Sequence, residues 1–154
     1  MTIEQLDRRI LSRLAGDARV SWAELAQELG LSAPAIGERV KRLKEKGLLL
    51  GFHARLAAPA LGLGLTAFVA VTLTHPRNRE SFLKVVRQRE EILEAHHMAG
   101  DDDFLLKVLC RDTAHLETLL TSVLKSIAGV QRTRTSIVLG TAKEFTALRP
   151  PAEV

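Results

Sequence analysis

SAPAIGERVKRLKEKG, residues 32–47, predicts the helix around which the first third of the chain is organised. Ser32 can accept a hydrogen bond from a free backbone N–H group, as residues that begin helices commonly do. Pro34 falls in the first turn, where a missing N–H donor costs little. Gly47 supplies the left-handed conformation that ends many helices. The stretch therefore predicts a single helix with a defined start and end.

One narrow stripe of this helix is apolar, and most of the remaining surface is basic. Ile36, Val40 and Leu43 recur at helical spacing, whereas residues 33–46 carry five basic and two acidic side chains. A helix with small residues at its tip and basic residues along its flank suits a DNA major groove. Taken alone, the helix could equally present a solvated charged face. The residues expected at a DNA interface are Ser32, Ala33, Pro34, Gly37, Glu38, Arg39, Lys41, Arg42 and Lys44.

The preceding residues place this helix in a larger motif. Apolar side chains recur at helical spacing over residues 4–14, and Ser21 with Glu24 forms a Ser-x-x-Glu capping box before a second helix. The inward face of that second helix is expected to hold Trp22, Leu25, Ala26 and Leu29. The order of two helices, a short glycine-containing turn and a third helix is that of a helix-turn-helix.

A small wing is expected after the third helix, as a short strand pair over residues 48–55. Three short helices also occur as protein-docking modules, which is the alternative interpretation of this part. A docking module needs an exposed apolar groove, however, and the spare face here is basic. DNA binding is therefore the favoured function.

Composition and charge indicate an ordinary globular protein with a mildly basic balance. The 154 residues are 46% hydrophobic, and the formal net charge is +4. The single cysteine, Cys110, excludes an internal disulfide framework and fits a reducing compartment. The sequence shows neither a signal peptide nor an apolar run of about 18 residues, the length needed to span a membrane. A cytoplasmic protein without a membrane partner is expected.

The second half predicts a different kind of domain. Residues 57–64, rich in Ala, Gly and Pro, are expected to form a hinge. The pattern beyond it is β-α-β-β-α-β, the ferredoxin-like arrangement of an antiparallel sheet with two helices on one face. Its expected elements are a strand over 65–74, a helix over 79–91, strands over 92–100 and 103–110, a helix from 112 or 113 to about 126, and a strand over 130–140.

The expected fold class is therefore α+β, with an N-terminal winged helix-turn-helix joined to a C-terminal ferredoxin-like βαββαβ domain. The expected boundaries are residues 1–56 for the DNA-binding domain, 57–64 for the hinge and 65–154 for the second domain. Strands 65–74 and 104–110 carry apolar residues on both faces, as Phe68 beside Val69 shows. Because two helices cover only one face, the bare face is expected to pack against another copy of the chain.

Several collinear motifs resemble the Lrp/AsnC family of regulators. They are LDRRIL (6–11), AELAQELGLS (23–32), ERVKRL (38–43), GLLLGF (47–52), GDDDFLLKV (100–108) and GVQRTRT (129–135). The resemblance spans nearly the whole chain and implies a transcription factor that binds double-stranded DNA. It also implies homodimers formed through the βαββαβ sheets, often assembled into octamers, with an amino acid held between dimers.

The resemblance places an effector pocket at the acidic turn and at the last strand. The implied residues are Met98, Gly100, Asp101, Asp103, Thr133, Thr135 and Ser136. Carboxylate and backbone groups can hold an α-ammonium group, and hydroxyls can hold an α-carboxylate. Two departures bear on the ligand: Asp102 stands where relatives often have a large residue, and His97 where they usually have an apolar one. A solvated hairpin turn, and a regulator that needs no effector, are the alternatives.

An enzyme is the rival from another class. Sirohaem decarboxylases resemble this architecture but carry a stretch rich in histidine and aromatic residues around the second and third strands. Here that region holds His96 and His97, no Trp or Tyr, and the acidic turn. Neighbouring residues of a strand point to opposite faces, so the two histidines are not expected to bind one metal ion. No catalytic residue, metal site or cofactor is expected. A sensor that has lost DNA binding conflicts with the basic helix.

Overall fold

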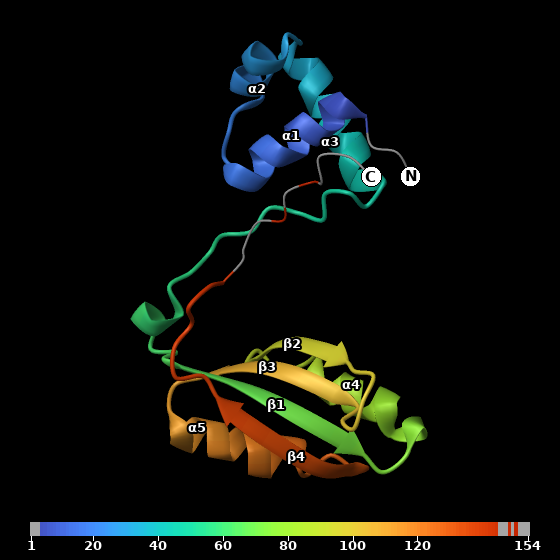
Figure 1. The fold of residues 1–154 in the computed structure, drawn as a ribbon, viewed down its shortest axis with the longest axis vertical. Coiled ribbons are helices and arrows are strands. Elements are labelled where there is room, and N and C mark those ends of the chain that lie inside the picture. Colours follow the sequence, from blue (N-terminus) through green and yellow to red (C-terminus); the bar gives the residue numbers. More distant parts are fainter. Residues whose placement is uncertain (1–3, 145–147, 149, 151–154) are drawn as a thin grey trace. The chain divides into compact units, whose positions relative to one another are not determined.

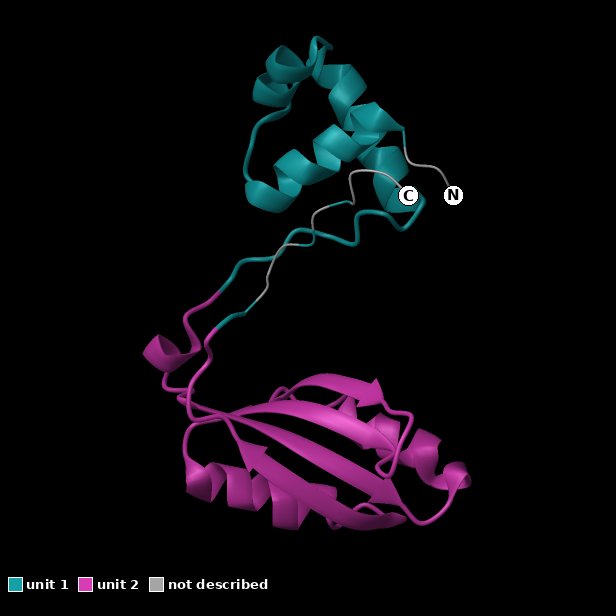
Figure 2. Cartoon of the chain, viewed as in Figure 1, with its two compact units in different colours: residues 1–55, 143–154 teal, residues 56–142 magenta. Residues whose placement is uncertain are grey.

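The computed structural model describes residues 4–144, 148 and 150, and they fold into two compact units. One unit holds the residues up to Arg55 together with those described from Lys143 onward, and the other holds Leu56–Ala142 (Figure 2). The first unit is helical and the second is built on a sheet (Figure 1). The predicted α+β class with two domains is confirmed.

Three helices form the first unit: α1 (Gln5–Gly16), α2 (Trp22–Leu29) and α3 (Ala33–Glu45). Both predicted caps are present. The Ser21 hydroxyl accepts from the Glu24 N–H at 3.2 Å, and the Ser32 hydroxyl accepts from the Ala35 N–H at 3.4 Å. The fully or nearly fully buried core that the helices share consists of Ile10, Leu11, Leu14, Val20, Leu25, Ala26, Ile36, Val40 and Leu43.

One predicted core residue lies elsewhere. Trp22 is 37% exposed, whereas Leu25 and Ala26 on the same helix are buried as expected. The apolar spacing placed Trp22 on the inward side, but it lies in the first turn of α2, where the core is already filled by smaller side chains from α1 and α3. The prediction of an inward Trp22 is wrong.

Helix α3 ends as predicted, and the way it ends removes the predicted wing. Gly47 has a φ of 68°, and the N–H groups of Gly47 and Leu48 donate to the carbonyls of Lys44 and Leu43 at 2.9 Å. This is a Schellman ending. Leu49 also donates to Leu43, at 3.1 Å, and Leu48 and Leu49 pack against the three-helix core. Residues 48–57 contain no strand. The predicted strand pair is wrong because the first residues that would build it are bound back to α3.

The second unit is a four-stranded antiparallel sheet in the order β2-β3-β1-β4, with bounds Leu65–Leu73 (β1), Ile92–His97 (β2), Phe104–Cys110 (β3) and Val130–Ile137 (β4). Helix α4 (Arg79–Val86) follows the short 3-10 turn η2 (Pro76–Asn78). Helix α5 (Thr113–Thr118) continues into the π-helical turn η3 (Leu119–Leu124). The β-α-β-β-α-β order is as predicted, although α4 ends at Val86 rather than at residue 91. A second 3-10 turn, η1 (Ala58–Leu61), lies within residues 57–64.

The helices cover one face of this sheet. Phe82 of α4 lies against Phe104 of β3, with 4.9 Å between the ring centroids, and both are buried. Alternate residues of the central strands, such as Val69 and Leu106, are buried on this side. On the other face Phe68 is 38% exposed. The strand pairing puts Leu105, Lys107 and Leu109 of β3, each only half-buried, beside β1 on that face. We call it the open face of the sheet.

Candidate functional site

The outward side of α3 is polar and exposed. Because Ile36, Val40 and Leu43 point into the core, helical geometry puts Pro34, Glu38, Lys41 and Arg42 on the opposite side, and all four are exposed. Lys41 and Arg42 are therefore available to the phosphates or base edges of a duplex. The N-terminal turn between Ser32 and Gly37 presents only small side chains to that side.

Arg39 takes a different role. Its guanidinium contacts the Asp7 carboxylate at 2.7 Å and the Glu4 carboxylate at 3.0 Å, and the pKa of Arg39 is raised, first by the hydrogen bond to Asp7 and then by that to Glu4. The side chain is only 24% exposed, and that of Asp7 is 13% exposed. Arg39 thus ties α3 to α1. The sequence predicts that Arg39 contacts DNA, and this stays a prediction; in the structure its guanidinium is bound to these two carboxylates.

Lys44 and Gly37 lie at the sides of α3. The Lys44 ammonium lies 4.9 Å from the centroid of the Phe52 ring, a cation–π distance. A Cβ built on Gly37 would lie 3.9 Å from Cδ1 of Trp22, so the indole passes over α3 at that position. Ala33 is half-buried and packs against the three-helix core. The nine predicted interface residues therefore share one helix but not one side of it.

The acidic turn of the second unit is bound tightly to the sheet. The Asp103 carboxylate accepts from the Leu73 N–H at 2.7 Å, and the Asp103 N–H donates to the Val71 carbonyl at 2.9 Å. Met98 donates to the Asp103 carbonyl at 2.9 Å. One carboxylate that the sequence assigns to an effector is thus already bonded to the end of β1, whereas Asp101 stays exposed.

Asp102, between these two, makes the contacts that sequence reasoning missed. Its carboxylate accepts from the Thr72 hydroxyl at 3.1 Å and from Arg134 at 2.7 Å, and lies 3.4 Å from Arg132. The side chain is 13% exposed. Two arginines two positions apart on a strand share a face, and this is the signal that could have marked Asp102 as their partner.

The hydroxyl residues of β4 divide between the two faces of the sheet. Thr133 and Thr135 pair with Val71 and Val69 on the helix side, whereas Ser136 pairs with Phe68 on the open face. Met98 is 41% exposed at the end of β2, and Gly100 has a φ of 153° in the turn. Within one chain, the turn reaches β4 through Asp102 and its arginines rather than through these hydroxyls.

The histidines have ordinary partners. His96 lies 3.0 Å from the Glu94 carboxylate, and this hydrogen bond is the main cause that lowers the pKa of Glu94. The His97 ring lies 5.3 Å from that of Phe104 on the helix side. Among residues 4–144, 148 and 150, no cluster of His, Cys, Asp and Glu is arranged to hold a metal ion. No helix in the same residues has the length and apolar character to cross a bilayer.

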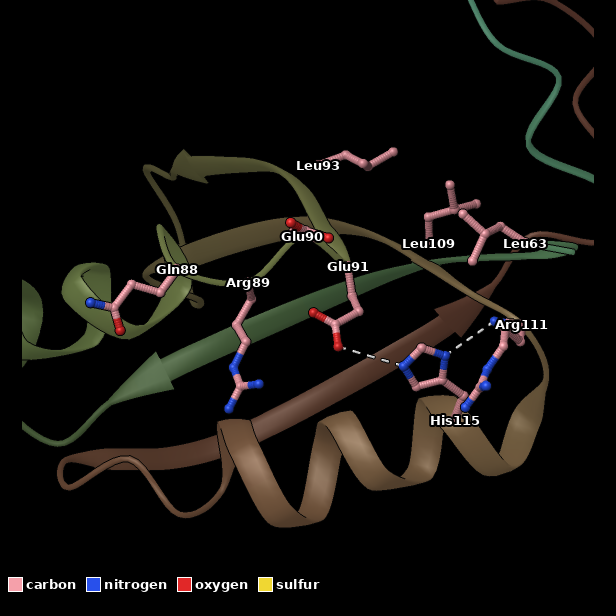
Figure 3. Close-up of a pocket in the computed structure, with 9 residues that line it drawn as sticks. All are labelled: Leu63, Gln88, Arg89, Glu90, Glu91, Leu93, Leu109, Arg111 and His115. Carbon is pink, nitrogen blue, oxygen red and sulfur yellow. Dashed lines mark hydrogen bonds and ion pairs between the residues drawn. The ribbon is translucent and has the colours of Figure 1, made fainter. Parts of the chain in front are cut away.

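A cleft of about 550 Å³ opens beside α5 (Figure 3). His115 faces Glu91 there, with 3.5 Å between Nε2 and the carboxylate, and its Nδ1 accepts from the Arg111 N–H at 3.3 Å. Because Nδ1 accepts a hydrogen bond, the ring proton lies on Nε2, which faces Glu91. Nε2 thus joins the start of α5 to the segment before β2, and Nδ1 is bound within the start of α5 itself, so the imidazole has a structural role.

Comparisons with known proteins match both units to domains of one family. Residues 3–44 match the AsnC-type helix-turn-helix domain, and residues 66–148 match the Lrp/AsnC ligand binding domain. The leucine-responsive regulatory protein of Escherichia coli is 37% identical over 148 residues, which are 95% of this chain and 90% of that protein.

Solved structures resemble the whole fold. AsnC of E. coli superposes with a TM-score of 0.89 at 31% identity, covering 97% of this chain and 100% of that one. The feast or famine regulatory protein of Mycobacterium tuberculosis, complexed with L-methionine, gives a TM-score of 0.88 at 33% identity, with coverage of 97% and 100%. With two domain matches and full-length likeness, the chain belongs to the Lrp/AsnC family of DNA-binding transcriptional regulators.

Proposed function

We propose that this regulator binds duplex DNA through the outward side of α3 and that an amino acid bound by its second unit modulates it. The observation that carries the first part is the exposure of Lys41 and Arg42 on a helix whose apolar stripe is fully buried. In a helix-turn-helix the second of the two helices enters the major groove. Arg42 and Lys41 are the proposed phosphate or base contacts, and Arg39 is the proposed positioning residue.

Salt-dependent binding tests the DNA interface. Each phosphate contact made by a cation releases counterions, so Arg42→Ala should lower the slope of log K against log salt by about 1. Fluorescence anisotropy of a labelled duplex between about 50 and 200 mM salt measures this slope. Lys125→Ala removes one exposed positive charge from the second unit and serves as the matched control. An Arg42→Ala protein with unchanged affinity and slope would remove Arg42 from the interface.

The proposed effector is an amino acid, and its binding residues are those of the acidic turn and of β4. Support comes from the match to a ligand-binding domain and from the relative that was solved with L-methionine. In one chain Thr135 and Ser136 point to opposite faces. Asp101 is the exposed carboxylate of the acidic turn, whereas Asp102 binds Arg134 and Asp103 binds the Leu73 N–H. We therefore propose that the pocket is completed between copies of the chain.

A thermal-shift screen of the twenty amino acids tests this proposal. One amino acid should raise the melting temperature, and Asp101→Asn should abolish the rise. Asp103 is less suitable for substitution because its carboxylate binds the Leu73 N–H, so its loss would weaken the fold itself. If no amino acid shifts the protein while DNA binding persists, the regulator acts without such an effector.

The proposed setting is the cytoplasm, where chromosomal DNA is found. The proposed assembly is a homodimer, with dimers joined further into an octamer or another assembly. The named relatives are transcriptional regulators, and we propose no catalytic role.

The enzyme alternative predicts that added sirohaem binds near His96 and His97 and that the absorption spectrum of the sirohaem shifts. An unshifted spectrum is expected, because His96 is already hydrogen-bonded to Glu94 and the His97 ring lies against that of Phe104.

A further inference from the structure

Trp22 is an exposed aromatic residue that the core does not explain. It lies in the first turn of α2 and is 37% exposed. It is also the only tryptophan in the sequence. A tryptophan offers only one hydrogen-bond donor, the indole N–H. Within the part of the chain that the structure describes, no hydrogen bond is formed by this donor.

Gly37 lets the indole lie against α3. The contact that a Cβ would make there, 3.9 Å to Cδ1 of Trp22, is of ordinary van der Waals length, whereas a long side chain would meet the ring. Glycine inside a helix costs about 1 kcal/mol relative to alanine. Gly37 therefore lowers the helical stability of α3, and the space that a larger side chain would fill there is taken by the Trp22 indole.

This placement puts the indole where the motif meets DNA. In a helix-turn-helix the first helix crosses the sugar–phosphate backbone while the N-terminal part of the second reads base edges. Trp22 stands at the beginning of the first of these helices, and its ring passes over the N-terminal half of the second. A residue in this position lies at the edge of the major groove.

We infer that Trp22 is a DNA contact: its indole N–H donates to a phosphate oxygen at the groove edge, and its ring supports α3 at Gly37. The inference rests on the proposed DNA interface of α3 and adds a contact that carries no charge. Side-chain hydrogen-bond donors commonly contact the DNA backbone, and such contacts fix the register of a protein on a duplex. The contact is to a phosphate, so it needs no particular base sequence.

Intrinsic fluorescence of the unmodified protein tests this directly, because all tryptophan emission comes from position 22. The probe is a mixed-sequence duplex of about 30 base pairs at low salt, where phosphate contacts dominate binding. Saturation with the duplex should change the emission and protect the indole from acrylamide quenching. Binding seen by anisotropy with unchanged emission and quenching would overturn the inference and leave the DNA-binding function intact. A protein that binds no duplex at low salt would overturn the function as well.

Trp22→Phe separates a DNA contact from mere support of the helix. The variant keeps an aromatic ring over Gly37 but loses the N–H donor, and we expect affinity to fall about tenfold. Since a neutral donor releases no counterion, the plots of log K against log salt should be parallel for Trp22→Phe and the unmodified protein, unlike that of Arg42→Ala.

The urea midpoint of Trp22→Phe, followed by circular dichroism, should match that of the unmodified protein. An unchanged affinity would overturn the phosphate contact, as would a loss of affinity that only accompanies a loss of stability. Trp22→His provides a second donor-bearing ring: it should recover part of the affinity that Trp22→Phe loses. Affinity no better than that of the phenylalanine variant, in a protein of equal stability, would also count against the contact.

Discussion

Ser21 and Glu24 close the start of α2 through reciprocal hydrogen bonds. The Ser21 N–H donates to the Glu24 carboxylate at 2.8 Å, and the Glu24 N–H donates to the Ser21 hydroxyl at 3.2 Å. These bonds satisfy donors that every helix leaves unpaired at its beginning. The stability of the first unit therefore depends on these polar atoms as well as on the core.

Ser21→Ala should destabilise the first unit by about 1 kcal/mol, because one capping bond is lost. Urea unfolding followed by Trp22 emission measures this, since the only tryptophan lies in that unit. Ser12→Ala, at an exposed position inside α1, is the matched control and should not destabilise the unit. Equal midpoints for the two variants would contradict the role of the cap.

The same cap should make stability depend on pH. The pKa of Glu24 is lowered by hydrogen bonds from the backbone and then the side chain of Ser21. A carboxyl group whose pKa is lower in the folded state stabilises that state above its unfolded pKa of about 4.3 and loses this contribution as pH falls through the folded pKa. The unmodified protein should therefore exceed Glu24→Gln in urea midpoint at pH 7, and the two midpoints should converge in acid. A difference that is independent of pH would show that the charge of Glu24 plays no part.

Ion pairs connect whole elements in both units. Arg39 joins α3 to α1 through Asp7, and Asp102 joins the β2–β3 turn to β1 and β4 through Thr72 and Arg134. Each pair includes a mostly buried carboxylate, so removing its partner leaves a charge that water reaches poorly. These contacts hold α3 against α1 and the β2–β3 turn against β1 and β4.

Arg39→Met should lower the stability of the first unit by about 1–2 kcal/mol, because Asp7 loses its partner. Water screens this ion pair in part, because about a quarter of the Arg39 side chain is exposed. Arg42→Met removes the same group from an exposed position of the same helix and should leave the urea midpoint unchanged. A larger loss of stability in Arg42→Met than in Arg39→Met would reverse the two assigned roles.

Asp102→Asn should destabilise the second unit by about 1 kcal/mol, because Arg132 and Arg134 then face each other without a shared carboxylate. Both arginines are more than half exposed, so high salt should shrink the difference from the unmodified protein. Thermal unfolding by circular dichroism, in the transition that Trp22 emission does not report, measures it. Glu117→Gln removes one negative charge from the exposed surface of α5 and should leave that transition unchanged.

The open face of the sheet bears on the assembly of the whole molecule. Phe68 lies there on the central strand β1, beside Lys107 of β3 and Ser136 of β4, and no helix of the second unit covers it. An exposed apolar face on a sheet is a common sign of an interface. We propose this face as the contact between two copies of the chain.

Phe68→Glu should shift the protein toward the monomer in sedimentation velocity at micromolar concentration, because it places a charge at the centre of the proposed interface. The same substitution at Leu50, which is 93% exposed in the first unit, should leave the sedimentation coefficient unchanged. If the unmodified protein sediments as a monomer, the proposed dimer is wrong.

The elements and their order could be predicted from the sequence. Capping residues, helical spacing and strand alternation are local signals, so the ends of α3, the capping box of α2 and the β-α-β-β-α-β order could be predicted. The motifs that resemble Lrp/AsnC regulators likewise lie along the chain and needed no structure.

Which side chains meet across the fold could not be predicted from the sequence. Arg39 and Arg42 look alike in the sequence, but one binds Asp7, which lies 32 positions away, and the other stays exposed. Asp102 meets arginines 30 and 32 positions later, and Leu48 and Leu49 return to α3 instead of pairing as a wing. Trp22 has an apolar spacing yet lies outside a core that other helices fill. Such contacts depend on how separate elements pack in space, and local spacing carries no information about that packing.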